Sequence, residues 1–320
     1  MINAGLVQLN SVCLAILNYN GIRYLQDLLP RACEAAKNYS SDCVVLVLDN
    51  RSMEPDVEWV KRNFRNVEIV VAPQNDFLFS YNWLAEDRQE EILIFLNNDL
   101  KLHRNFVRPL VRHFVYNDVF AVSATSRDWD DKIFTCGPAR LKCHHGIYEW
   151  DYQRNNQKLC HTLFTSGGFM AVHREKFLRL RGFNRLLWPG YAEDLDLCFR
   201  AWRKGWRSIF EPESVVWHRE SVSWSNGTDE RAVSLMFRAS LLLQWSSLPP
   251  AANWLERTSF LCLTAFRKIL KGQGWWLKIR IETWMEWQKI RKDYSELMTS
   301  PQELQRICTR IEQPIPDPGQ

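Results

Sequence analysis

The chain lacks the apolar segments that carry proteins through or across a membrane. None of its apolar runs approaches the ~20 residues that span a bilayer. The first ten residues, MINAGLVQLN, have no basic stretch ahead of an apolar run, as a secretion signal would. We therefore expect a cytosolic protein, or one that lies on a membrane surface.

Paired cysteine motifs are missing as well. The nine cysteines are odd in number and include no C-x-x-C pair, which favours reduced thiols over a disulfide framework. One group has zinc-ligand residue types: Cys136, Cys143, His144, His145, Cys160 and His161. Its spacing matches no usual zinc finger, so we prefer to interpret these residues as loop histidines and core cysteines.

Neither common phosphate-binding loop is present. After the first predicted strand the sequence reads NYNGIRYL, where a dinucleotide site needs G-x-G-x-x-G and a P-loop needs G-x-x-x-x-G-K-[ST]. If a nucleotide diphosphate binds, its charge must be met in another way. A divalent cation held by a carboxylate is the available means.

What is present is an alternation of strands and helices. Apolar runs predict strands at 12–17, 44–48, 67–71 and 92–96, and amphipathic patterns predict helices at about 22–37, 55–64 and 80–90. Apolar runs without polar alternation are typical of strands covered on both faces. The first 100 residues therefore predict an α/β fold with a parallel sheet.

Polar residues follow two of these strands directly. Asp49 ends the second, and Asn97, Asn98 and Asp99 end the fourth. Open α/β sheets bind their ligands at the carboxyl ends of the strands, so both places are candidate site positions. For Asp49 the alternative is an ordinary turn or capping residue.

The middle of the chain holds further candidates. Gly167 and Gly168 precede a helix that opens with Glu193 and Asp194, and a predicted strand ends at His218. Each has a structural alternative: acids at a helix start often interact only with the helix dipole, a glycine pair often only forms a tight turn, and a lone histidine is often only packed.

Together these residues resemble the family 2 glycosyltransferases with a GT-A fold, particularly their bacterial rhamnosyltransferase-like branch. The resemblance covers about residues 10–225. It rests on AILNYNG, LVLDNRS, FLNNDL, GGFMAVHREKF, YAEDLDLCFRAWRKGW and VWHRES in this order. It implies a mostly parallel sheet flanked by helices, with residues 1–228 as the catalytic domain and 229–320 as a C-terminal helical extension.

The resemblance also implies roles for individual residues. Asp194, with Glu193, is the expected general base, and Asp99 and His218 are the expected ligands of Mg²⁺ or Mn²⁺. The expected donor-binding residues are Asn18, Asp49, Asn82, Asn97, Asn98, Gly167 and Gly168. The donor is then a nucleotide-diphosphate sugar, with a thymidine or uridine diphosphate sugar as the first expectation.

The sequence departs from the family pattern at three places. Asn97 replaces the first aspartate of the DXD motif, which leaves Asp99 as the charged ligand. Ala192 stands where a glycine usually precedes Glu193, a change that we expect to leave the helix start in place. Phe77 and Tyr81 stand where relatives carry glycine, and we expect their bulk to reshape the wall near the donor nucleotide.

The implied reaction is inverting transfer of a sugar to the hydroxyl of a saccharide or a lipid-linked (polyprenol-linked) saccharide. The alternative is a non-catalytic partner subunit that binds a nucleotide sugar or glycan, an alternative motivated by Asn97 and the bulky 77–81 segment. A nucleotidyltransferase is disfavoured because the glycine-rich basic loop after the first strand is missing.

The C-terminal third predicts helices at about 229–246, 252–270, 274–293 and 301–311. Residues 231–292 carry eleven Lys or Arg against three Asp or Glu, and six of the fifteen tryptophans lie between 245 and 287. This combination suits an anionic membrane interface, which would place the protein on the cytoplasmic face of the inner membrane. The alternative is packing on the catalytic domain, with Trp276, Ile279, Thr283, Trp287 and Ile290 on one face. Nothing resembles a nucleic-acid-binding element.

Overall fold

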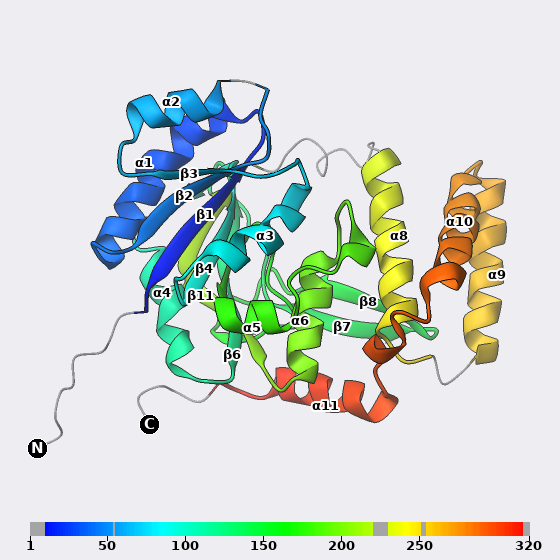
Figure 1. Cartoon of the computed structure of the whole chain (residues 1–320). Helices are drawn as coiled ribbons and strands as arrows, with labels where there is room; N and C mark the ends of the chain where they lie inside the picture. Colours follow the sequence, from blue (N-terminus) through cyan, green and yellow to red (C-terminus); the bar gives the residue numbers. More distant parts are fainter. Residues whose placement is uncertain (1–9, 54, 220–229, 251–253, 316–320) are drawn as a thin grey trace, which may run out of the picture.

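A central sheet organises the molecule. The computed structural model describes residues 10–53, 55–219, 230–250 and 254–315 (Figure 1). The nine strands of the sheet are β1 (Val12–Asn18), β2 (Val44–Asp49), β3 (Glu68–Val71), β4 (Ile92–Asn97), β5 (Leu100–Leu102), β6 (Val119–Asp128), β9 (Cys160–His161), β10 (Phe169–His173) and β11 (Arg207–His218). A separate hairpin pairs β7 (Ala139–His144) with β8 (Ile147–Tyr152).

The strand order is β3-β2-β1-β4-β10-β6-β11-β5, with β9 paired to β11. Strands β3, β2, β1 and β4 pair in parallel, and so do β6 and β11. Strand β10 lies antiparallel between β4 and β6, so β6 and β11 run in the same direction as β4. The mostly parallel α/β sheet predicted from the sequence is confirmed.

Helices cover both faces of this sheet. The described α-helices of the whole chain are α1 (Ile22–Tyr39), α2 (Asp56–Asn63), α3 (Ser80–Asp87), α4 (Val107–Val111), α5 (Arg174–Arg179), α6 (Glu193–Arg203), α8 (Glu230–Ser246), α9 (Trp254–Leu270), α10 (Trp275–Ile290) and α11 (Pro301–Glu312). Each helix predicted from the sequence is present, and its described ends differ from the prediction by a few residues; the predicted starts at 229 and 252 lie outside the described residues.

The side chains of β1 explain why its apolar run is continuous. Cys13 and Ala15 belong to the buried cluster that contains α3 and α6, whereas Leu14 and Ile16 belong to the cluster that contains α1 and α4. Successive side chains of a strand point to opposite faces, and here both faces are covered.

The C-terminal helices share the core of the sheet domain. Buried side chains of α8, α10 and α11, among them Leu242, Trp287 and Ile307, lie in the same cluster as α6. In α10, Trp276 and Thr283 are buried too, so the face predicted from the sequence does pack inward. Figure 1 shows α8, α9 and α10 at one end of the molecule, with α11 crossing back beneath α6. None of the described helices combines the length and apolarity needed to cross a bilayer.

Candidate active site

The sheet topology brings most of the predicted site residues to one edge. Strands β1, β2, β4 and β11 end there with Asn18, Asp49, Asn97 and His218. Because β10 runs in the opposite direction, the glycine pair just before its first residue reaches the same edge. This is the edge at which α/β sheets bind ligands.

A network of buried and half-buried side chains joins the ends of β1, β2 and β4. The Asn98 amide donates to Oδ1 of Asn18 at 2.9 Å. The Asn18 amide in turn donates to Asp56 at 2.8 Å and to Asp49 at 3.2 Å. Asp56 also accepts from the backbone N–H of Gly21 at 2.7 Å. The network fixes the loops after three strands relative to one another.

Asp49 has a structural task at this edge. Its Oδ2 accepts from the backbone N–H of Ser52 at 3.0 Å, which closes the turn that follows β2. The Asp49 side chain is buried. The observed contacts of Asp49 are therefore those of a turn residue, the alternative that its sequence position allowed. A contact between Asp49 and a donor nucleotide stays a prediction.

Asp99 and His218 lie side by side. His218 Nε2 is 3.4 Å from Asp99 Oδ1, and this buried oxygen has no hydrogen-bond partner among the described residues. The pairing of β11 with β5 sets the contact, because it places His218 opposite Leu100. A buried carboxylate oxygen without a donor, next to an imidazole nitrogen, fits a divalent cation, although two side chains alone leave most of its coordination to other ligands.

The glycine pair lies between the Asn97–Asp99 segment and Asp194. A Cβ at Gly168 would come within 2.7 Å of the Asn97 amide nitrogen, and a Cβ at Gly167 would come within 3.2 Å of Leu78. The Gly167 N–H donates to Asp194 Oδ2 at 3.0 Å. The close approach that the glycines permit is thus to protein side chains, and it connects the two acidic parts of the site.

Asp194 and Glu193 begin α6, as predicted. Ala192 has a φ of 59°, in the left-handed region that favours the glycine found in relatives, yet the helix still starts at Glu193. Alanine at this position therefore carries backbone strain of about 1 kcal/mol without displacing the acids.

The two carboxyl groups have different surroundings. Burial, and next the Asp194 charge, raises the pKa of Glu193, whose Oε2 has no hydrogen-bond partner among the described residues. Burial also raises the pKa of Asp194, but the N–H groups of Gly167 and Leu195 donate to its two oxygens and oppose that rise. When the two carboxyl groups hold one proton between them, that proton is therefore on Glu193. Asp194 is then the ionised carboxylate.

A cavity of about 150 Å³ lies against both acids. Aromatic side chains form much of its wall: Trp150 and Tyr152 of β8, Phe164 and Tyr191. Met236 of α8 lines it as well. Aromatic rings beside a carboxylate can stack on the apolar face of a ligand while the acid meets its polar edge.

Asn82 is one predicted residue that the structure places in another role. Its amide donates to the Phe183 carbonyl at 2.9 Å and accepts from the Phe183 N–H at 2.7 Å. Both polar atoms of this side chain hold the turn at Gly182 and Phe183. A contact between Asn82 and the donor remains a prediction.

The expectation for Tyr81 is wrong. Its ring is fully buried and stacks on Phe95 at 4.1 Å between centroids, and its hydroxyl donates to carbonyls of Ala15 and Leu96. Tyr81 therefore fills the core and does not line a donor wall. Phe77 is partly exposed and packs against Trp188, and its place in a wall near the donor stays a prediction.

The residues with zinc-ligand types do not converge. Among the described residues, no three His, Cys, Asp or Glu side chains form a metal-binding group. His145 lies 2.8 Å from Glu256, and His161 contacts the Gln313 carbonyl at 3.0 Å. The segment around Cys143 forms the β7–β8 hairpin.

Sequence reasoning missed two features of the site. Asp56 resembles an ordinary helix-start acid in the sequence, yet it joins the buried network through Asn18 and has a second buried oxygen without a partner in the described part of the chain. The aromatic wall was missed too, although the alternating pattern of IYEWDY at 147–152 is a strand signal.

Comparison with known proteins agrees with this fold. The family model described as glycosyl transferase family 2 matches residues 11–181, more than half of the chain. Curated protein sequences give no match.

Three solved structures are similar. GalNAc-T7 with UDP, GalNAc and Mn²⁺ has a TM-score of 0.59 at 15% identity, over 75% of this chain and 48% of that one. The mannosyltransferase PcManGT from Pyrobaculum calidifontis, in complex with GDP-Man and Mn²⁺, has a TM-score of 0.55 at 15% identity, over 94% and 79%. S. aureus TarS 1–349 with UDP-GlcNAc has a TM-score of 0.52 at 11% identity, over 72% and 66%.

The chain thus spans about half the length of the GalNAc-T7 structure. At these identities the structural likeness shows the fold alone, and the sequence match shows the family. This chain, with its GT-A fold, belongs to glycosyl transferase family 2.

Proposed function

We propose that the protein is an inverting glycosyltransferase that moves a sugar from a nucleotide-diphosphate donor to a hydroxyl of a saccharide or lipid-linked saccharide. One observation carries the proposal. Asp194 is held by Gly167 beside the Asn97–Asp99 segment, and it faces a cavity with aromatic walls. This arrangement supports a role for the Asp194 carboxylate between donor and acceptor.

Asp194 acts as the general base. The acceptor hydroxyl attacks the anomeric carbon of the donor sugar, the bond from that carbon to the diphosphate oxygen breaks, and the hydroxyl proton passes to Asp194. A positioned base contributes roughly 10²- to 10⁴-fold to such a step. The two N–H donors to Asp194 keep it ionised and oriented, while Glu193 beside it holds a proton.

A divalent cation, Mg²⁺ or Mn²⁺, would be held by Asp99 and His218, with the donor diphosphate completing its shell. Support comes from the unpartnered Oδ1 of Asp99 and from the Mn²⁺ in the GalNAc-T7 and PcManGT complexes. When bound, the ion neutralises charge that develops on the leaving diphosphate. Asn18, Asn97, Asn98, Asp49 and the glycine pair then shape the donor side.

The finer assignments rest on resemblance. They are membership of the rhamnosyltransferase-like branch, a thymidine or uridine diphosphate sugar as donor, and division into a catalytic domain at 1–228 and an extension at 229–320. We also propose that the extension lies on the cytoplasmic face of an anionic membrane, because large apolar side chains of α9 and α10, such as Phe266 and Trp284, are exposed.

A panel of nucleotide sugars, assayed for hydrolysis and transfer with Mg²⁺ or Mn²⁺, tests the activity. We expect turnover of at least one donor. Asp99→Asn should reduce it roughly a hundredfold or more, since a bound ion supplies several kcal/mol of charge stabilisation. The exposed Asp87→Asn is the matched control and should leave it unchanged. Saturable donor binding without turnover of any donor would instead indicate the non-catalytic partner subunit.

A further inference from the structure

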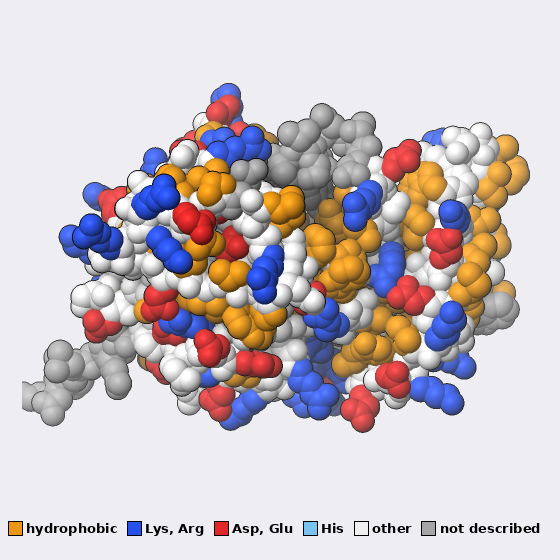
Figure 2. Space-filling model, turned by 45° about the horizontal axis from the view of Figure 1, so that its top comes forward, with side chains coloured by type: hydrophobic (Ala, Val, Ile, Leu, Met, Phe, Trp, Pro, Cys, Tyr) orange, Lys and Arg blue, Asp and Glu red, His pale blue; other side chains and the backbone are white. Residues whose placement is uncertain are grey.

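A groove separates helices α8, α9 and α10, away from the sheet edge. Its volume is about 680 Å³. Most of its wall is apolar: Trp245, Leu261, Leu277, Ile281 and Trp284. Figure 2 shows hydrophobic side chains gathered over this end of the molecule, with Lys and Arg interspersed. The proposed transfer reaction does not account for this groove.

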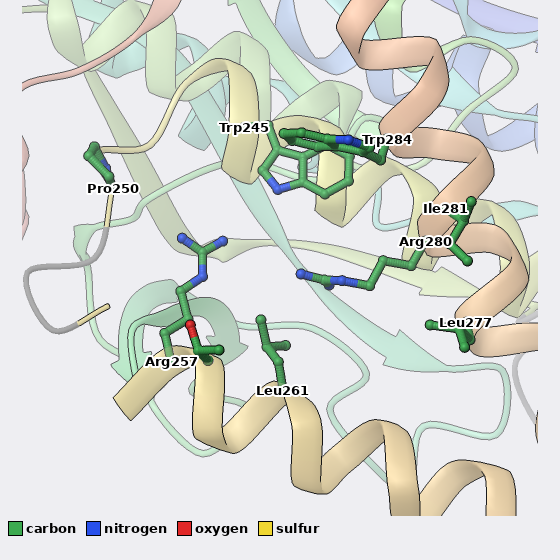
Figure 3. Close-up of a pocket in the computed structure, with 9 residues that line it drawn as sticks. Trp245, Pro250, Arg257, Leu261, Leu277, Arg280, Ile281 and Trp284 are labelled. Carbon is green, nitrogen blue, oxygen red and sulfur yellow. The ribbon is translucent and has the colours of Figure 1, made fainter. Parts of the chain in front are cut away.

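Two arginines enter the groove from opposite walls. Arg257 comes from α9 and Arg280 from α10, and both guanidinium groups project into the groove (Figure 3). Both side chains are half-buried. Burial, and next the charge of Arg257, lowers the pKa of Arg280. Two like charges in apolar surroundings repel, so this arrangement favours an anion between them.

No described carboxylate forms an ion pair with either arginine, although Glu149 lines the adjoining cavity together with both of them. The three acids between 231 and 292 are engaged elsewhere: Glu256 with His145 at 2.8 Å, Glu286 with Arg238 at 2.6 Å, and Glu282 nearest Lys278 at 3.9 Å. Neither groove arginine forms an ion pair or a hydrogen bond with a described residue. Arg280 lies over the rings of Trp245 and Trp276.

We propose that this groove binds a phosphate-headed amphiphile, with the phosphate or diphosphate between Arg257 and Arg280 and the apolar chain along the tryptophan and aliphatic wall. Guanidinium groups match phosphate oxygens in paired hydrogen bonds. A free phosphate would satisfy the arginines but leave the apolar wall uncovered. A lipid covers both.

Helix α8 links the groove to the candidate active site. Met236 lines the cavity beside Asp194, and Trp245 lines the groove. Nine residues separate them, about 14 Å along the axis and two and a half turns, so the two side chains leave opposite faces of α8. A sugar carried by a lipid phosphate in the groove would have to reach Asp194 around this helix. This last step, which makes the amphiphile the lipid-linked acceptor, rests on the proposed function.

Binding of dodecyl phosphate to the full chain, below its micelle-forming concentration, tests the groove. Isothermal titration should show saturable binding. Arg257→Gln/Arg280→Gln should weaken it at least tenfold without lowering the melting temperature, because the substitution removes like-charge repulsion. Arg267→Gln/Lys289→Gln is the matched control. It removes one cation each from α9 and α10 outside the groove and should bind as the unsubstituted chain does.

Two further ligands distinguish binding of the phosphate head from binding of the dodecyl chain. Dodecyl maltoside has the chain without the phosphate, and inorganic phosphate has the charge alone; both should bind at least tenfold more weakly than dodecyl phosphate. Equal binding of the maltoside, equal binding of inorganic phosphate, or equal losses in the two double variants would each overturn the proposal.

The test of the groove does not depend on the proposed sugar transfer. Dodecyl phosphate binding needs neither a donor nor Asp194. A chain that hydrolyses donor but does not bind dodecyl phosphate contradicts the groove alone. A chain that binds dodecyl phosphate in this way but turns over no donor supports the groove and contradicts the transferase.

Discussion

Glu193 has a buried carboxyl group that is only partly hydrogen-bonded. It is 9% exposed, and one of its oxygens has no hydrogen-bond partner among the described residues. Its neighbour Asp194 receives two backbone N–H donors. The proton is therefore best placed on Glu193, which leaves one negative charge, on Asp194, facing the cavity.

This arrangement predicts how stability depends on pH. Burial raises the pKa of Glu193 in the folded chain above its value in the unfolded chain. Between the two values the folded state binds more protons, so the free energy of unfolding falls as pH rises. The Glu193→Gln variant has no titrating group at this position, so its free energy of unfolding does not fall for this reason as pH rises. The melting temperature of the variant minus that of the unsubstituted chain should rise between about pH 5 and pH 8.

The exposed Glu58→Gln is the control, for which the difference should stay flat with pH. A flat difference for Glu193→Gln as well would mean that Glu193 titrates as an ordinary surface carboxyl group. Thermal melts followed by circular dichroism across this pH range give the answer.

At the residue scale, the sequence predicted where the site residues lie on the sheet better than it predicted which side chains they contact. Asp49, Asn97 and Asp99 directly follow apolar strands, and this pattern alone indicates the ligand-binding edge. The task of Asp56 depends on Asn18 and Gly21, which lie 38 and 35 residues away in the chain. For Tyr81, comparison with glycine-bearing relatives suggested a donor wall, whereas its hydroxyl finds partners on β1 and β4 inside the core.

At the scale of elements, helix α6 is held by a second helix from the end of the chain. Arg203 of α6 donates to the Leu297 carbonyl at 2.6 Å, and Arg310 of α11 donates to the Gly205 carbonyl at 2.8 Å. Ile307 of α11 is buried in the cluster that contains α6. The C-terminal segment therefore supports the helix that carries Asp194.

Truncating Ile307 tests this support. Ile307→Ala should lower the free energy of unfolding by about 2–5 kcal/mol, because it opens a cavity in a packed core. Leu270→Ala on the exposed face of α9 removes a similar volume and should change it by less than about 0.5 kcal/mol. Urea titration measures both. Similar midpoints for the two variants would show that α11 does not stabilise the domain.

Elements were predictable where a pattern had a single interpretation. The continuous apolar runs of β1, β2 and β4 are such cases. The β7–β8 hairpin alternates apolar and polar residues, a strand pattern, but its cysteine and histidines are also zinc-ligand residue types, so the segment had two interpretations. Strands β5, β9 and β10 are two to five residues long, too short for a periodic pattern, and tertiary pairing defines them.

At the scale of the whole molecule, the C-terminal helices have two different faces. One face buries Trp276 and Trp287, and Trp287 belongs to the core cluster of the sheet domain. The other exposes Leu263, Phe266 and Leu270 of α9 near the basic residues of the same helix. The sequence offered packing on the catalytic domain and a membrane interface as alternatives. It could not show which helix packs inward, since that depends on how α8, α9 and α10 pack.

Membrane attachment predicts binding that depends on charge and salt. The chain should co-sediment with anionic vesicles at low salt and much less at about 1 M salt, where electrostatic screening shortens to about 3 Å. Leu263→Ser/Phe266→Ser/Leu270→Ser should bind more weakly than the unsubstituted chain. No binding to anionic vesicles at low salt would refute the attachment.

The most direct test of the account is Asp194→Asn, measured in turnover and in donor binding together. This substitution keeps the size of the side chain and the acceptor oxygen for the Gly167 N–H, but it removes the base. We predict that turnover falls by roughly 10²- to 10⁴-fold while the dissociation constant of the donor changes little. Normal turnover in this variant would contradict the central claim that Asp194 accepts the proton of the acceptor hydroxyl.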